Sequence, residues 1–162
     1  MGLGRKDILL HSWGVVMEEE GWHPPLVQAL EGVTETQADW RPEGGASNTI
    51  RETVHHLTFY KERLLQRLKG LEPAPYNGNT NTFQNSDPSM DWEQAIAKLV
   101  AVHREINGYL TDFQDADLDK PLPETPVGGQ LLSLALHDAY HTGQIILLRK
   151  LQGSWPGSRE FE

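Results

Sequence analysis

Apolar residues recur every three or four positions along most of the chain, which is the spacing of an α-helix buried on one side. Clusters of Pro and Gly interrupt the pattern and separate the helical segments. We predict helices at about residues 6–20, 24–30, 49–69, 91–113 and 130–151. Strand-like alternation of apolar and polar residues is nowhere sustained. The pattern therefore predicts an all-α protein, an up-down four-helix bundle with long loops between the helices.

One connection stands out by its length and polarity. Residues 72–89, EPAPYNGNTNTFQNSDPS, are rich in Asn and Pro and are too polar to belong to a core. Connections of this length are often functional. We expect residues 73–89 to line or cover a pocket, although they contain no recognisable substrate motif.

Two histidines interrupt the apolar helix expected at 130–151, within the stretch LHDAYHTGQI. At about 100° per residue, His137 and His141 lie about 40° apart on the helix. Four polar residues fall on the same side: Gln130, Ser133, Tyr140 and Gln144. Apolar residues occupy nearly all the remaining directions around the helix, so the helix is expected to be buried. The side chains of the polar stripe then need hydrogen-bond or metal partners. The pair is either hydrogen-bonded structure or two metal ligands on one helical face.

HDAYH also resembles the H-E-x-x-H motif of metalloproteases, with Asp138 where that motif has glutamate. Aspartate is one methylene shorter, and the strand-rich surroundings of such proteases are missing. Asp138 lies about 100° from His137, so it either partners the site or faces solvent or a neighbouring helix. We assign no general base.

A third ligand has to come from another helix. The segment TVHHL offers His55 and His56, which cannot both face one site. On the helical wheel His56 lies roughly 110° from the centre of the apolar face and His55 roughly 150°, which favours His56; two exposed histidines are the alternative. His103 falls near the middle of the apolar face of the helix expected at 91–113. That position is typical of a core histidine, and a fourth ligand or a pocket wall is the alternative.

Composition narrows the chemistry and the partners. The chain has no cysteine and a net charge of -9, from 23 acidic and 14 basic side chains. Zinc–thiolate sites and a cysteine nucleophile are excluded, so a metal site would use histidine and carboxylate and thiol chemistry would need an external thiol. An acidic chain gains little from binding phosphates, so we expect no nucleic-acid partner.

The length of 162 residues fits one domain, covering residues 1–162. No apolar stretch approaches the roughly 18 residues of a membrane-spanning helix, so we expect no membrane partner. The first residues, MGLGRKD, lack the apolar core of a signal peptide, which indicates a cytoplasmic protein.

Residues 24–57 and 136–153, with the spacing between them, resemble the DinB-like (YfiT-like) family of small bacterial four-helix-bundle metalloenzymes. The resemblance covers most of the chain, with the Asn-rich connection and the termini least matched. It implies that His56, in the pattern S/N-x-I-x-E-x-V-x-H-L, binds a divalent metal ion. It implies the same for His137 and His141, in the pattern H-x-x-x-H-x-G-Q-I. Members of the family often dimerise, so we expect a homodimer.

Three neutral imidazoles would leave a coordination position open, which is the arrangement of a catalytic metal. The resemblance implies a metal-dependent enzyme of the thiol S-transferase or hydrolase type, because relatives of this fold use a low-molecular-weight thiol. Water as the nucleophile is equally compatible with a chain without cysteine. We expect one zinc or nickel ion and a small-molecule substrate, with Tyr140, Gln144 and His103 supporting the ligands or lining the pocket. The alternative is a non-catalytic metal- or ligand-binding bundle with a structural or sensing role.

Overall fold

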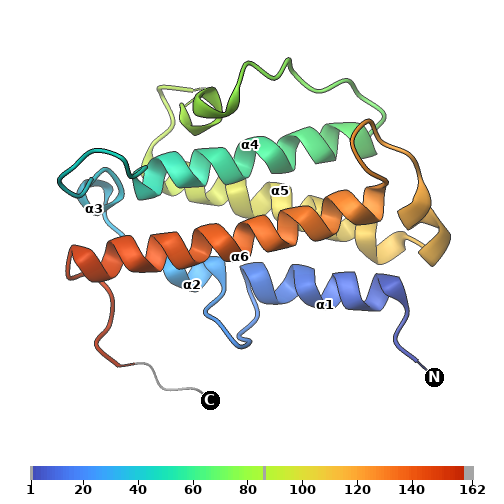
Figure 1. The fold of residues 1–162 in the computed structure, drawn as a ribbon, viewed down its shortest axis with the longest axis horizontal. Coiled ribbons are helices and arrows are strands. Elements are labelled where there is room, and N and C mark those ends of the chain that lie inside the picture. The colour runs from blue at the N-terminus through green and yellow to red at the C-terminus, as the bar shows by residue number, and fades with distance from the viewer. Residues whose placement is uncertain (1, 86, 159–162) are drawn as a thin grey trace.

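The computed structural model describes residues 2–85 and 87–158, and these residues form helices and connections without a β-strand. Ser86 in the polar connection, and residues 1 and 159–162 of the expected domain, lie outside the described residues. Four long helices dominate the described chain: α1 (Arg5–Met17), α4 (Ile50–Leu68), α5 (Trp92–Asp112) and α6 (Val127–Leu151) (Figure 1). The shorter elements are α2 (Leu26–Leu30), α3 (Glu35–Ala38) and the 3-10 helices η1 (Asn79–Phe83) and η2 (Asp115–Asp119). The all-α prediction is confirmed.

Helix boundaries follow local sequence signals. Thr49 precedes α4, and its hydroxyl accepts a hydrogen bond from the backbone N–H of Glu52 while the Glu52 carboxylate accepts one from the Thr49 backbone N–H. Such a reciprocal pair satisfies backbone donors that the first turn of a helix leaves unpaired. The last helix begins at Val127 rather than at residue 130, and its first turn packs closely on Leu118, where a Cβ at Gly128 would lie 3.0 Å from the Leu118 Cβ. No helix in the described ranges combines the length and the apolar composition that crossing a membrane requires.

The chain does not simply alternate in direction from one long helix to the next. Helices α4 and α5 run in the same direction. Two ion pairs show this: Glu62 pairs with Lys98, and Lys69, further along the chain, pairs with Glu105, further along α5. The 19-residue α4 is about 28 Å long, and residues 69–91 are long enough to return along it before α5 begins. Alternation holds between α1 and α4 and between α5 and α6 (Figure 1). The predicted up-down order is therefore wrong at the long polar connection.

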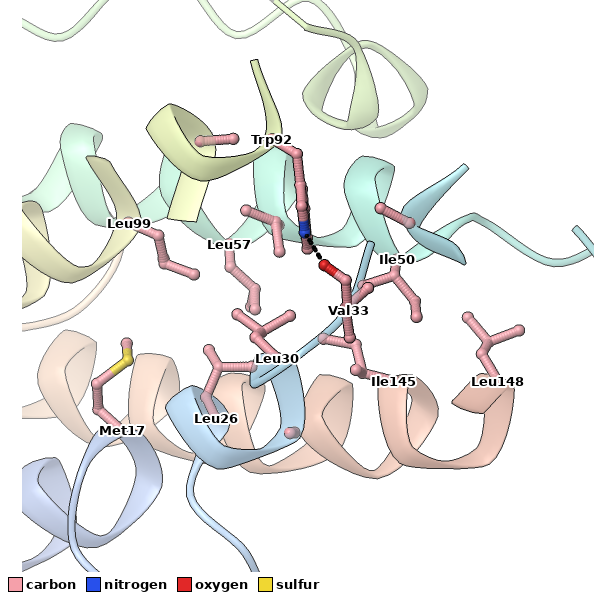
Figure 2. Close-up of a cluster of buried hydrophobic side chains, with 14 residues drawn as sticks. Met17, Leu26, Leu30, Val33, Ile50, Leu57, Trp92, Leu99, Ile145 and Leu148 are labelled. Atoms are coloured by element: carbon pink, nitrogen blue, oxygen red, sulfur yellow. Dashed lines mark hydrogen bonds between the residues drawn. The ribbon is translucent and has the colours of Figure 1, made fainter. Parts of the chain in front are cut away.

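Two apolar clusters fill the space between the long helices. The first is closed by α2 and by the indole of Trp92, whose Nε1–H donates to the carbonyl oxygen of Val33 at 2.7 Å (Figure 2). The second, around Trp13 and Leu131, joins α1 and the first half of α6 to the later parts of α4 and α5. On α4 and α6, buried polar side chains lie between the residues of the two clusters, among them Lys61, Asp138 and His141. This polar layer contains the candidate site.

Candidate metal centre

The structure brings together the three histidines predicted as ligands. Nε2 of His137 lies 2.9 Å from Nε2 of His56 and 3.1 Å from Nε2 of His141. The candidate ligand atoms of all three lie within 4.8 Å of one another. His137 and His141 are one helical turn apart on α6, and α4 supplies the third ring from across the helix contact. His56 and His141 are buried and His137 is half-buried.

Of the adjacent pair on α4, His56 faces this group and His55 does not. His55 is half-buried and lines a separate cavity beneath the Asn-rich connection. One step along a helix rotates the side chain by about 100°, which is enough to place the neighbours on different sides of α4. The wheel-based preference for His56 as the inward residue agrees with this placement.

All three histidines are held in the neutral form. Burial, with the nearby His137 and His141, lowers the pKa of His56 to about 3. Burial, with His141 and the positive charge of Lys61, lowers the pKa of His137 to about 4. Burial also lowers the pKa of His141, and Gln144 opposes this shift. Neutral imidazole is the form that binds metals, so at neutral pH no proton has to be displaced from the group.

The short distances between the nitrogen atoms require a proton or a cation between the rings. A neutral imidazole Nε2 either carries a hydrogen or presents one in-plane lone pair, but not both. Nε2 of His137 can therefore make a proper N–H···N hydrogen bond with only one of its two neighbours. A metal ion accepts a lone pair from each nitrogen and satisfies all three rings at once. The residues present fit a divalent ion.

A cleft of about 560 Å³ opens onto the three histidines. Besides the histidines, eight residues line it: Asn48, Tyr60, Asn79, Phe83, Ser133, Leu134, Tyr140 and Gln144. Tyr140 and Gln144, which were expected to line the pocket or support the ligands, both lie in its wall. None of the described lining residues is Asp, Glu, Lys, Arg or Cys. The cleft therefore combines aromatic and neutral polar walls with the histidine group.

Helix η1 makes two contacts with His56 that sequence reasoning missed. The hydroxyl oxygen of Thr82 lies 2.6 Å from Nδ1 of His56, and the Phe83 ring stacks on the imidazole with centroids 3.9 Å apart. Tyr60 donates a hydrogen bond to the side-chain oxygen of Asn79, which ties η1 to α4. Residues 73–89 were expected to line the pocket, and η1 does so. No periodicity or motif indicated which of its side chains would reach a histidine, because the contact joins residues 26 positions apart.

His103 lies outside the cleft, within the core. Its ring stacks on Trp13 with centroids 4.4 Å apart, and its Nδ1 lies 3.3 Å from Nζ of Lys61. Burial, with the charge of Lys61, lowers the pKa of His103 to about 2. Of the alternatives left open by the sequence, the structure agrees with a core histidine, because the middle of the apolar face of α5 packs against α1. Within the described part of the chain, the contacts of the His103 ring are with Trp13 and Lys61 and not with the three histidines, so the expected support of the metal ligands is not observed.

Asp138 turns away from the histidine group and toward α4. Its Oδ2 lies 2.5 Å from Nζ of Lys61, and both side chains are essentially inaccessible to solvent. Burial raises the pKa of Asp138 and lowers that of Lys61, while the attraction between them opposes both shifts. The carboxylate in HDAYH is therefore bound to a neighbouring helix and is not aimed at a metal ion.

Comparison with known families agrees with this geometry. The model of the DinB superfamily matches residues 24–145, which is more than half of the chain. The chain belongs to the DinB superfamily. The matched range includes all three histidines of the site and η1. Proteins of the DinB superfamily often bind metal, which agrees with a three-histidine group that can hold an ion. A search of curated proteins finds no match to the chain.

Proposed function

We propose that this DinB superfamily protein binds one divalent metal ion through His56, His137 and His141 and is a metal-dependent enzyme. The observation that carries the proposal is the convergence of three neutral imidazoles at an open cleft. Three imidazole ligands suit zinc and nickel, which are the ions we favour.

We favour chemistry of the thiol S-transferase or hydrolase type. A metal ion in this position supplies Lewis-acid activation of a bound thiol or water, whose pKa it lowers toward neutrality. The chain itself has no cysteine, and the described lining residues include no carboxylate. Because no thiol or carboxylate lines the cleft, we favour an external nucleophile, either water or a low-molecular-weight thiol. The hydroxyl group of Tyr140 and the amide of Asn48 are available to orient a small polar substrate.

The alternative is a non-catalytic site with a structural or sensing role. A structural zinc site usually has four protein ligands. Within the described residues the group has three members, and His103 and Asp138, two other candidate ligands, contact Lys61 instead. This arrangement favours an open coordination position and therefore catalysis.

The proposal is tested by metal analysis of protein purified without a histidine tag. We expect about one zinc or nickel ion per chain, and a chain that stays folded by circular dichroism after chelation. Protein that contains no ion above background and takes up neither zinc nor nickel on dialysis would overturn the proposal. Unfolding on chelation would favour the structural alternative. Activity on small electrophiles that requires added thiol indicates a transferase, and activity on esters or amides without thiol indicates a hydrolase.

We also propose that the protein forms a homodimer through α6. Five large apolar side chains on this helix are 46–64% exposed: Leu132, Leu136, Tyr140, Leu147 and Leu151. Their spacing of four or seven residues places them along one side of the helix. A row of exposed apolar residues of this kind is typical of an interaction surface, and a second copy of the same helix offers a matching one.

A further inference from the structure

We propose that Thr82 of η1 is a positioning residue for His56, holding the imidazole in the tautomer whose Nε2 lone pair faces His137 and His141. The inference rests on the proposed metal site for its consequence. Its first test concerns the metal-free chain and is independent of metal binding.

The hydrogen bonds around Thr82 determine the tautomer. The Thr82 side chain is buried, and its Oγ1 lies 2.6 Å both from the carbonyl oxygen of Asn79 and from Nδ1 of His56. A hydroxyl group has one hydrogen, and a carbonyl oxygen can only accept. Thr82 therefore donates to Asn79, and the remaining contact is satisfied when Nδ1–H of His56 donates to Thr82. A neutral imidazole with its hydrogen on Nδ1 has a free lone pair on Nε2.

The same segment fixes the plane of the His56 ring. Phe83 lies parallel to the imidazole, with an angle of 8° between the rings. Tyr60 packs its ring edge against His56 from the same helix, with centroids 5.0 Å apart, and its hydroxyl binds Asn79 of η1. Rotation about the side-chain bonds of His56 would break the Thr82 hydrogen bond and the Phe83 stack together.

His56 needs this support more than its partners do. His137 and His141 share α6, so one helical turn sets their relative position. His56 is the single member of the group from α4, and its ring has to meet the other two across a helix–helix contact. A hydrogen bond to the ring nitrogen that does not bind metal is the usual way to fix a histidine ligand, and its loss typically costs 10–100-fold in metal affinity.

The first experiment measures the tautomer in the wild-type chain. In ¹⁵N-histidine-labelled protein freed of metal at pH 7.5, long-range ¹H–¹⁵N spectra should show His56 with its hydrogen on Nδ1. The His56→Gln variant assigns the signal by its disappearance. A wild-type His56 with its hydrogen on Nε2 would overturn the inference even if the protein binds metal. A chain with the Nδ1–H tautomer that binds no metal would leave the tautomer assignment standing and defeat the proposed function instead.

The second experiment measures zinc affinity by competition with a chelator. Thr82→Val keeps the shape of the side chain and removes the hydroxyl, and we expect zinc affinity to fall about 10–100-fold. Thr82→Ser should retain near wild-type affinity. Thr80→Val, at an exposed position of the same 3-10 helix, is the matched control and should bind zinc normally. Melting of the metal-free variants separates positioning from stability, and a Thr82→Val protein with unchanged zinc affinity would refute the inference.

Discussion

His55 and His56 are identical side chains at adjacent positions, and their surroundings differ completely. His56 lies among two other imidazoles, the Phe83 ring and the Thr82 hydroxyl. The ring of His55 faces the cavity beneath the Asn-rich connection, and its Nε2 is buried without a hydrogen-bond partner among the described residues. A comparison of the two positions therefore separates a role in the site from the general effects of losing a histidine.

This comparison gives a direct prediction about the ligands. We expect His56→Ala to reduce bound metal to background, because two imidazoles from α6 alone hold an ion weakly. His55→Ala should retain about one ion per chain, since His55 lies outside the group. Elemental analysis of both untagged variants, dialysed against zinc, makes the measurement. Equal loss of metal from the two variants would contradict the assignment of His56.

His103 gives a prediction about pH and stability. Its pKa falls from 6.5 to about 2 on folding, so the unfolded chain binds one more proton than the folded chain between these values. The contribution of His103 to the free energy of unfolding is therefore fully present above pH 6.5 and decreases as the pH falls below that value. Removing this proton uptake should reduce the slope of unfolding free energy against pH by up to about 1.4 kcal/mol per pH unit.

We expect this smaller slope in His103→Gln, which keeps an acceptor for Lys61 but does not titrate. Urea unfolding of metal-free protein between pH 7.5 and 5.5 measures the slope in the variant and in the wild type. The other histidines are common to both proteins and cancel in the difference. Parallel curves would show that His103 is not held neutral by the fold.

At the scale of elements, the contact between α4 and α6 contains a buried ion pair next to the candidate site. Lys61 is fully buried, with its ammonium 2.5 Å from Asp138 and 4.3 Å from the centre of the Trp13 ring. Both groups lose their hydration on folding, so each buried charge is compensated only by its partner. The pair also holds α4 and α6 together one step from His137.

Breaking this pair from one side should be costly. Lys61→Met leaves the Asp138 carboxylate buried without a partner and should lower the free energy of unfolding by about 3–5 kcal/mol. The double variant Lys61→Met, Asp138→Leu should recover most of the loss, because neither member of the pair then leaves an uncompensated buried charge. Urea unfolding at neutral pH measures both, with Arg104→Met, which removes an exposed ion pair with Glu18, as the control expected to change little. A single variant as stable as the double variant would contradict this account.

At the scale of the whole molecule, α6 has three different sides. One packs into both apolar clusters, one presents His137 and His141 to the cleft, and one carries the exposed apolar row. Tyr140 belongs both to this row and to the cleft wall. A partner seated on α6 would therefore lie beside the entrance to the candidate site.

If the exposed apolar row on α6 forms the dimer interface, charged substitutions in this row should lower the molecular mass of the protein in solution. Leu136→Glu combined with Leu147→Glu should convert a dimer into a folded monomer, because two carboxylates would have to be buried in the interface. Leu71→Glu, at an equally exposed position in the connection after α4, should leave the dimer intact. Light scattering coupled to size-exclusion chromatography measures the mass. A wild-type protein that is monomeric at high concentration would rule out the proposed dimer.

Hydrophobic periodicity was sufficient to predict the long helices, the shared face of His137 and His141, and a preference for His56. The buried side of a helix recurs every 3.6 residues, and this pattern can be read from a short stretch of sequence. His137 and His141 were therefore expected on one side of α6, and His56 was preferred to His55. The absence of cysteine limited the metal chemistry equally directly. Family resemblance then linked the two helices, a pairing that no local pattern contains.

Only the tertiary structure decided the remaining features, because each depends on contacts between segments far apart in the sequence. The parallel course of α4 and α5 follows from how residues 69–91 return across the bundle, and local patterns carry no information on direction. The Lys61–Asp138 pair joins residues 77 positions apart, and the Thr82–His56 contact joins residues 26 positions apart. Periodicity shows which side of a helix is buried but not which atoms it meets, and those atoms set the tautomer, the charge and the shape of the site.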